Sequence, residues 1–242
     1  MLFKTRGIVF HRIKYSESSV IVKIYTENYG LQSYLIKGIR RKDSKLKPAL
    51  LQHLTLLEFI ATGKNNSNLK YIKEITAIYP FKTIPFDIKK SSVIIFLNEI
   101  LYNSIREEEA NEDLFEFIYN AIMYLDLGEK INVGFSLWFL IHLTKFLGFF
   151  PRHRENDGFA TFNMEEGIIS DKILPQPTDV SMPFSRYIIE LMNCNLGELH
   201  TISISKKDRL ILLDILLRYY KNHLPGLGEI KSHYVLQSVL ND

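Results

Sequence analysis

Hydrophobic positions alternate with polar ones along the first third of the chain. Between residues 4 and 79 the period is close to two, and β-branched and aromatic residues are frequent, which is typical of half-buried strands. Turn-forming residues interrupt the alternation at each expected break. The pattern predicts five strands, at residues 3–15, 18–26, 31–37, 50–61 and 69–79.

Five short antiparallel strands are too few for two good sheets, and closure into a small barrel removes their exposed edges. We therefore expect an OB-fold or an SH3-like barrel. Within the second strand Val20, Val22 and Ile24 share one face, and this set is expected in the core, while Ile21, Lys23 and Tyr25 face the other way.

After Pro80 and Pro85 the apolar spacing changes from two towards 3.6, which predicts helices. The fold class is therefore α+β, with a barrel domain at residues 1–80 and a mainly helical domain at residues 81–242. An insertion at about residues 149–183 is expected to form a small hairpin that turns near Glu166 and Gly167. Asp87, Asn111 and Ser205 are candidate N-caps. Helices are predicted at residues 87–105, 112–127, 133–147, 184–194, 206–223 and 232–240.

The net charge of +3 hides an asymmetry, because residues 1–80 carry 14 Lys and Arg against 5 Asp and Glu, while the remainder carries 16 against 22. The strongest local feature is the loop at residues 37–47, with six positive side chains and one negative. Clustered cations neutralise phosphates with little regard to base sequence. The predicted nucleic-acid contacts are Arg6, Lys14, Lys23, Lys37, Arg40, Arg41, Lys42, Lys45 and Lys47.

Aromatic side chains on the same barrel have two interpretations. OB-folds combine a basic groove with rings on which bases stack, and Tyr25, Tyr29 and Tyr34 are available for this. Each is also a normal structural residue of a small barrel. In the helical part, an aromatic region around Trp138 and Phe149 is expected first as core, with a peptide-binding pocket as the alternative.

Motifs for catalysis or metal binding are missing from the sequence. No phosphate-binding glycine loop, HExxH, GxSxG or SxxK is present, and Cys194 is the one cysteine, which suits a buried thiol at a helix end. We expect no catalytic residue, no metal and no cofactor. No apolar stretch reaches the length of a membrane span, and no signal peptide is seen, so a cytoplasmic protein without membrane contact is expected.

Taken together, the residues resemble the RecO family. The match begins with Lys4-Thr5-Arg6-Gly7-Ile8-Val9 and continues through Tyr15-Ser16-Glu17-Ser18-Ser19, Thr26-Glu27-Asn28-Tyr29-Gly30, Lys37-Gly38-Ile39-Arg40-Arg41 and Leu50-Leu51-Gln52. In the helical part Leu147-Gly148-Phe149-Phe150-Pro151, Tyr219-Tyr220 and Lys231-Ser232 also fit.

The resemblance implies an OB-fold and a non-catalytic recombination mediator in bacterial DNA repair, associated with the nucleoid. Such a protein binds single- and double-stranded DNA and anneals complementary strands. It would work with RecR and with the C-terminal tail of single-strand-binding protein to load RecA. Some family members carry a four-cysteine zinc site after the segment matching residues 147–151, and this chain, with Cys194 alone, lacks it.

Two rival functions come from other classes. A protein adaptor would bind partners through the barrel and helices without itself contacting DNA, and its basic residues would serve solubility or acidic partners. An enzyme such as a nuclease would need catalytic groups that converge from distant segments.

Overall fold

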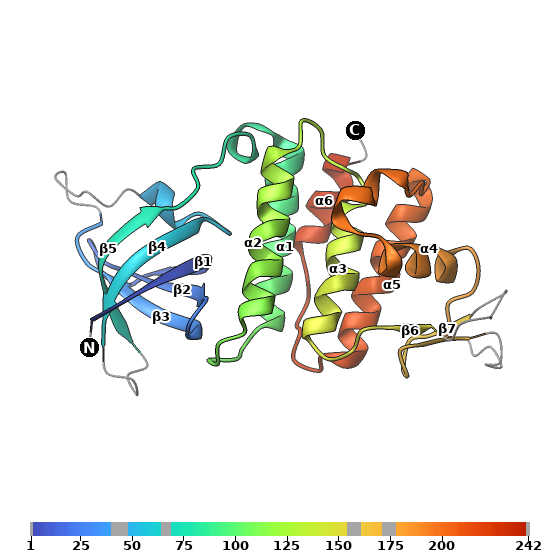
Figure 1. The fold of residues 1–242 in the computed structure, drawn as a ribbon, viewed down its shortest axis with the longest axis horizontal. Helices are drawn as coiled ribbons and strands as arrows, with labels where there is room; N and C mark the ends of the chain where they lie inside the picture. Colours follow the sequence, from blue (N-terminus) through green and yellow to red (C-terminus); the bar gives the residue numbers. More distant parts are fainter. Residues whose placement is uncertain (1, 40–47, 64–68, 154–160, 171–177, 241–242) are drawn as a thin grey trace. The chain divides into compact units, whose positions relative to one another are not determined.

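The computed structural model describes residues 2–39, 48–63, 69–153, 161–170 and 178–240 (Figure 1). The chain forms two compact units, residues 1–128 and residues 129–242. The first unit contains the barrel and two helices, so the domain boundary expected after residue 80 falls inside it. Whether the barrel of residues 1–80 folds independently stays a prediction.

The barrel is closed, with strand order β1-β2-β3-β5-β4 and β1 paired to both β2 and β4. All pairings are antiparallel except that of β3 with β5. This confirms the five-stranded OB-fold barrel. The strands are β1 (Leu2–Lys14), β2 (Val20–Thr26), β3 (Gly30–Ile36), β4 (Leu56–Thr62) and β5 (Lys70–Ala77).

The barrel interior is filled by one face of each strand. Val20, Val22 and Ile24 belong to this core, as the alternation predicts, and Tyr34 packs edge-on against Phe59 inside it. Gly7 on β1 is required by close packing, because a Cβ there would collide with the side chains of Ile24 and Phe59. The strand pattern therefore identifies the correct inward set.

The fourth predicted strand begins later than expected. Residues 48–51 form a 3₁₀ helix whose Leu51 is buried in the barrel core. Leu54 then takes a positive φ of 56°, and its amide donates to the Val9 carbonyl. The apolar run before residue 56 is therefore a 3₁₀ helix that fills one end of the barrel, followed by a turn. Its consecutive apolar residues resemble those of a buried strand, which is why the sequence predicted one there.

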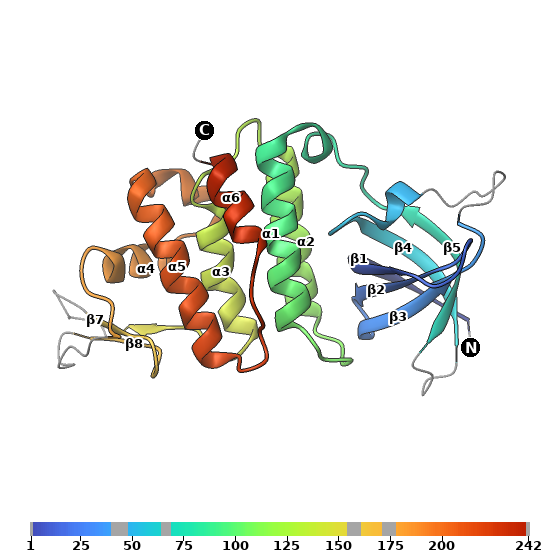
Figure 2. The ribbon, with the colours of Figure 1, turned by 180° about the vertical axis from the view of Figure 1, so that it is seen from behind.

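Two antiparallel helices complete the first unit, α1 (Ile88–Ser104) and α2 (Glu112–Leu127) (Figures 1 and 2). Their expected N-caps are confirmed, since the side chain of Asp87 accepts from two amides of the first turn of α1 and that of Asn111 accepts from Leu114. The loop between the helices lies against the barrel, where the Leu31 amide donates to the Glu107 carbonyl.

Asp126 near the end of α2 holds the connector between barrel and helices. Its carboxylate is fully buried and accepts from the Tyr79 hydroxyl at 2.9 Å and from the amides of Lys82, Thr83 and Ile84 at 2.8, 2.9 and 2.9 Å. Burial alone would raise the pKa of Asp126, but these donors together lower it below its ordinary value. The segment after the barrel is thus fixed by one carboxylate.

The second unit is built from helices that run side by side around an aromatic core (Figure 2). Trp138 and Phe139 are buried, Trp138 donates to the Cys194 carbonyl, and the Tyr220 hydroxyl donates to the Leu140 carbonyl. The aromatic region is therefore core, as expected first. Its helices are α3 (Phe135–Phe146), α4 (Phe184–Asn193), α5 (Lys206–His223) and α6 (Ser232–Leu240), and Ser205 caps α5.

The expected hairpin is present and has a third strand. β7 (Thr161–Asn163) and β8 (Ile168–Ser170) are antiparallel, with Gly167 in the turn at a φ of +66°, which glycine adopts without strain. β6 (Arg152–His153) adds to β8 in parallel. Across the described ranges, no helix combines the length and the apolar character needed to cross a bilayer.

Candidate nucleic-acid interface

The outer surface of the barrel carries one row of side chains across four strands. Register pairs Ile13 with Ile21, Ile21 with Leu35, and Leu35 with Tyr71. Residues opposite each other in neighbouring strands lie on the same face, and this face is opposite to the one that carries Val22. Ile13 and Tyr71 at the two ends of the row are 46% and 44% exposed, respectively.

Two cations flank this row at one end of the barrel. Lys14 pairs in register with Val20, and Val20 pairs with Ile36, the residue before Lys37. Lys14 and Lys37 are both exposed, and the ammonium of Lys37 lies 5.2 Å from the centre of the Tyr71 ring. We call Ile13, Ile21, Lys37 and Tyr71 the Lys37–Tyr71 face, and Lys14 lies at its edge, at the end of β1 and in register with the core residue Val20.

The turn after β1 lies beside this face. The Tyr15 amide donates to the Ser19 carbonyl, and the Ile39 amide donates to the Ser18 carbonyl. The β1–β2 turn therefore packs against the start of the basic loop, and it presents Tyr15 with 61% of its surface exposed. In OB-folds the face of the second and third strands and the loops after the first and fourth strands hold oligonucleotides.

The structure places the predicted contacts in different environments. Lys14 and Lys37 both lie at one end of the barrel, whereas Lys23 is half-buried with its ammonium 5.6 Å from the ring centre of Tyr102. Arg6 lies towards the opposite end of the barrel, where Gly7 pairs with Thr26. The five loop residues Arg40, Arg41, Lys42, Lys45 and Lys47 lie outside the described residues.

Arg6 is engaged within the protein. Its Nε and Nη2 donate to the Glu27 carboxylate at 2.9 and 2.5 Å, and Nη2 also pairs with Glu116 on α2. The guanidinium carbon lies 5.2 Å from the Phe115 ring centre. The hydrogen bonding of Arg6 to Glu27 is the main cause that raises the pKa of Arg6. A phosphate would have to displace two carboxylates to reach this group.

The tyrosines considered from the sequence are mostly structural. Tyr34 lies inside the barrel, and Tyr25 is buried with its ring stacked on Phe10. Tyr29 is 37% exposed and packs edge-on against Phe3. Two further rings, Tyr15 and Tyr71, are exposed on the barrel and were not selected from the sequence. The alternation in β5 carries a signal for Tyr71, because Ile72 faces inwards and its neighbours face out.

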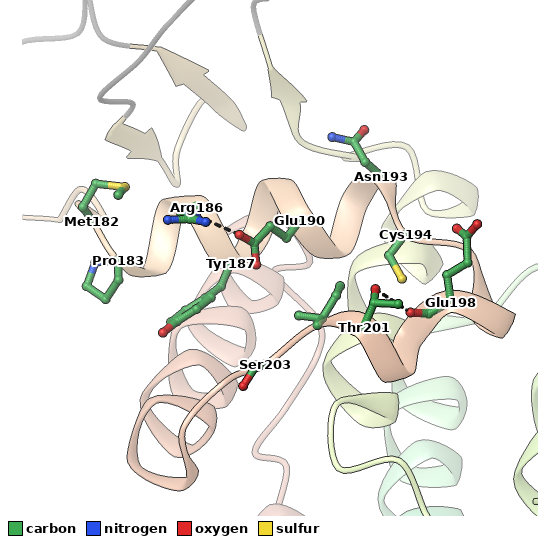
Figure 3. A pocket seen from close by; sticks show the side chains of 11 residues that line it. Met182, Pro183, Arg186, Tyr187, Glu190, Asn193, Cys194, Glu198, Thr201 and Ser203 are labelled. Atoms are coloured by element: carbon green, nitrogen blue, oxygen red, sulfur yellow. Dashed lines mark hydrogen bonds and ion pairs between the residues drawn. The ribbon is translucent and has the colours of Figure 1, made fainter.

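A cleft of the second unit has a different character (Figure 3). It measures about 780 Å³ and lies between α4 and residues 194–203. Arg186, its one guanidinium, pairs with Glu190 at 2.7 Å, and Glu198 adds a second carboxylate. This lining repels phosphate.

Cys194 borders the same cleft and is buried, as expected from its position at a helix end. Its thiol donates to the Asn195 carbonyl, and burial raises its pKa, so the nucleophilic thiolate is disfavoured. Among the residues described, no three His, Cys, Asp or Glu side chains gather as a metal site.

Comparison with known proteins agrees with the barrel. The sequence matches the family model for the N-terminal part of recombination protein O over residues 1–81, and the model for its C-terminal part over residues 85–156. It is 39% identical to DNA repair protein RecO of Flavobacterium psychrophilum and 35% identical to that of Bacteroides fragilis, with both chains of each pair covered fully. It is 36% identical to DNA repair protein RecO of Flavobacterium johnsoniae, again over the full length of both. The chain therefore belongs to the RecO family of DNA repair proteins.

Proposed function

We propose that this protein binds DNA through the Lys37–Tyr71 face and acts in recombinational repair without catalysing a reaction. A single strand would cross the outer surface of β2 and β3, with phosphates held by Lys14, Lys37 and the cations of the loop that follows. Bases would stack on the exposed tyrosines. Both parts of this arrangement are typical of OB-folds that bind strands regardless of sequence.

The observation that carries the proposal is the pairing of Lys37 with Tyr71. The ammonium lies 5.2 Å from the ring centre, and the ring is 44% exposed beside Leu35, which is itself buried. A base on this ring would place its phosphate near the ammonium. Since every base has a flat face, such a site accepts any sequence.

Annealing follows from the same charge distribution. Cations on the barrel would screen the phosphates of two strands at once and reduce their repulsion, while leaving bases free to pair. Backbone contacts of this kind also accept double-stranded DNA. We propose that the protein works with RecR and the C-terminal tail of single-strand-binding protein to load RecA. Its place of action would then be the bacterial nucleoid.

The test is fluorescence anisotropy of a labelled oligo-dT strand with the full chain, between about 20 and 300 mM salt. Lys37→Gln is expected to reduce the log-log salt slope by about 0.7, because one phosphate contact is lost. Tyr71→Ala should weaken binding about tenfold or more through loss of stacking. The matched control is Lys4→Gln, because Lys4 is exposed on the same barrel but already pairs with Glu58 at 2.8 Å.

Two results would oppose the proposal. Binding that is unchanged in both variants would show that the strand does not bind at this face. Absence of binding at low salt would favour the rival function, a protein adaptor whose barrel does not itself bind DNA. The exposed Ile13 and half-buried Ile21 of the row suit that rival, and partner binding through them would persist in high salt, because apolar contacts are screened far less.

A further inference from the structure

One cleft of the first unit is lined by Arg12, the residue that precedes Ile13 of the Lys37–Tyr71 face on β1. It measures about 270 Å³ and lies between the barrel rim and the start of α1. The floor is formed by Leu51, Ile84 and Ile94, all nearly inaccessible to solvent, and Ile95 in the wall is 45% exposed. Its volume is about nine times the roughly 30 Å³ of one liquid water, so the cleft has room for one flat ring.

The rim of this cleft carries one guanidinium group. Arg12 from β1 and His53 from the turn before β4 line it, and no carboxylate does. Arg12 is exposed, and within the described residues its guanidinium has no ion pair, in contrast to Arg6. Burial is the main cause that lowers the pKa of the nearby His11, and the electrostatic effects of His53 and Lys23 lower it further. An apolar cleft under unpaired positive charge suits an anion attached to an apolar ring.

The cleft also continues the proposed path of the strand. Arg12 and Lys14 lie on the same strand two residues apart, which is about 7 Å in an extended chain. A DNA strand with one phosphate at Lys14 can therefore place a neighbouring phosphate at Arg12. The Ser91 hydroxyl, one of the polar groups of the lining, already donates to the Ile84 carbonyl, so an apolar occupant suits the interior.

We propose that this cleft accepts one unstacked base of the bound single strand, with the adjoining phosphate held by Arg12. The inference rests on the proposed function, because it assumes that a strand runs along the Lys37–Tyr71 face. The cleft would fix the path of the strand at one end of that face, while bases on the outer rings remain accessible for pairing.

The experiment uses the full chain and a set of oligo-dT strands, each carrying a single 2-aminopurine at a different position. This base is dim when stacked and brighter when it is withdrawn into an aliphatic environment. With the wild-type protein, emission should rise at one or a few positions. Ile95→Glu, which places a carboxylate at the mouth, should abolish that rise and weaken binding by up to about tenfold.

The matched control is Ile88→Glu, the same substitution on α1 at a residue that is 71% exposed and does not line the cleft. It should leave the emission unchanged. Arg12→Gln provides a second variant that leaves the apolar wall intact, and it should lower the salt slope of strand binding by about 0.7.

The outcomes separate the two proposals. Strand binding without any rise in emission, or a rise that survives in Ile95→Glu, would overturn the base cleft and leave DNA binding on the barrel intact. Loss of all strand binding in the wild type would overturn the proposed function itself. Binding of a labelled acidic peptide with an apolar end to wild type but not to Ile95→Glu, without competition from oligo-dT, would make the cleft a protein-docking site instead.

Discussion

Arg6 on β1 and Glu116 on α2 form an ion pair that joins the barrel to the helical pair of the first unit. The same guanidinium also binds Glu27, which follows β2. One side chain therefore connects two strands and a helix, and its charge is compensated within the fold. Arg6, which the sequence predicts as a DNA contact, is therefore held by ion pairs within the protein.

Arg6→Gln is accordingly expected to reduce stability and to leave DNA affinity nearly unchanged. The loss should be about 1–2 kcal/mol, because the hydrogen bonds are charge-assisted but the site is partly solvated. Chemical unfolding followed by circular dichroism measures the stability. A double-mutant cycle with Glu116→Gln should show positive coupling between the two positions. A drop in DNA affinity as large as that of Lys37→Gln would instead show that Arg6 contacts DNA.

Asp126→Asn should be among the more damaging single changes in the first unit. The amide would direct its own N–H groups at donors that now bind a carboxylate, all in a site without solvent access. We expect a loss of about 2–4 kcal/mol in the free energy of unfolding. Asp113→Asn on the exposed start of the same helix is the control, with an expected cost below about 1 kcal/mol. Equal losses in the two variants would show that the buried hydrogen bonds contribute little.

The domain boundary near residue 80 can be tested with two fragments. In the structure the rings of Phe10 and Tyr25 are buried, and Tyr25 also faces Phe115 of α2 at 6.3 Å between ring centres. A fragment of residues 1–80 uncovers these rings, while residues 1–128 keep them covered. Both fragments should form the barrel, with the shorter one melting at least about 10 °C lower. Equal melting temperatures would mean that the helices add nothing to the barrel.

His142 makes the second unit sensitive to mild acid. Burial is the main cause that lowers its pKa below the ordinary 6.5, and its Nε2 lies 3.0 Å from the Leu191 carbonyl. Because the unfolded chain binds this proton more readily, stability is fully present above about pH 6.5 and falls as the pH drops through the folded pKa. His142→Gln should flatten this dependence. Urea unfolding followed by the fluorescence of Trp138, whose ring stacks on His142, reports it. A pH profile identical to the wild type would assign the effect to other groups.

The alternation of residues in β2 was enough to predict the barrel and its core, because inward and outward positions in a strand differ by a single step. The same local rules predicted the caps at Asp87, Asn111 and Ser205, where one side chain bonds to amides two or three residues away. The run before residue 56 misled the strand prediction, since a 3₁₀ helix and a turn contain the same apolar residue types as a strand.

By itself, the sequence determined the OB-fold, the helices that follow and the membership of the RecO family, because periodicity, turn residues and motifs are local properties of the chain. The tertiary structure decided which cations are available. Arg6 pairs with two carboxylates, one of them distant in sequence, while Arg12 is exposed beside an apolar cleft and Lys37 lies over Tyr71. Such pairings depend on strand register and on how helices pack against strands, which join residues far apart in the chain and leave no local pattern.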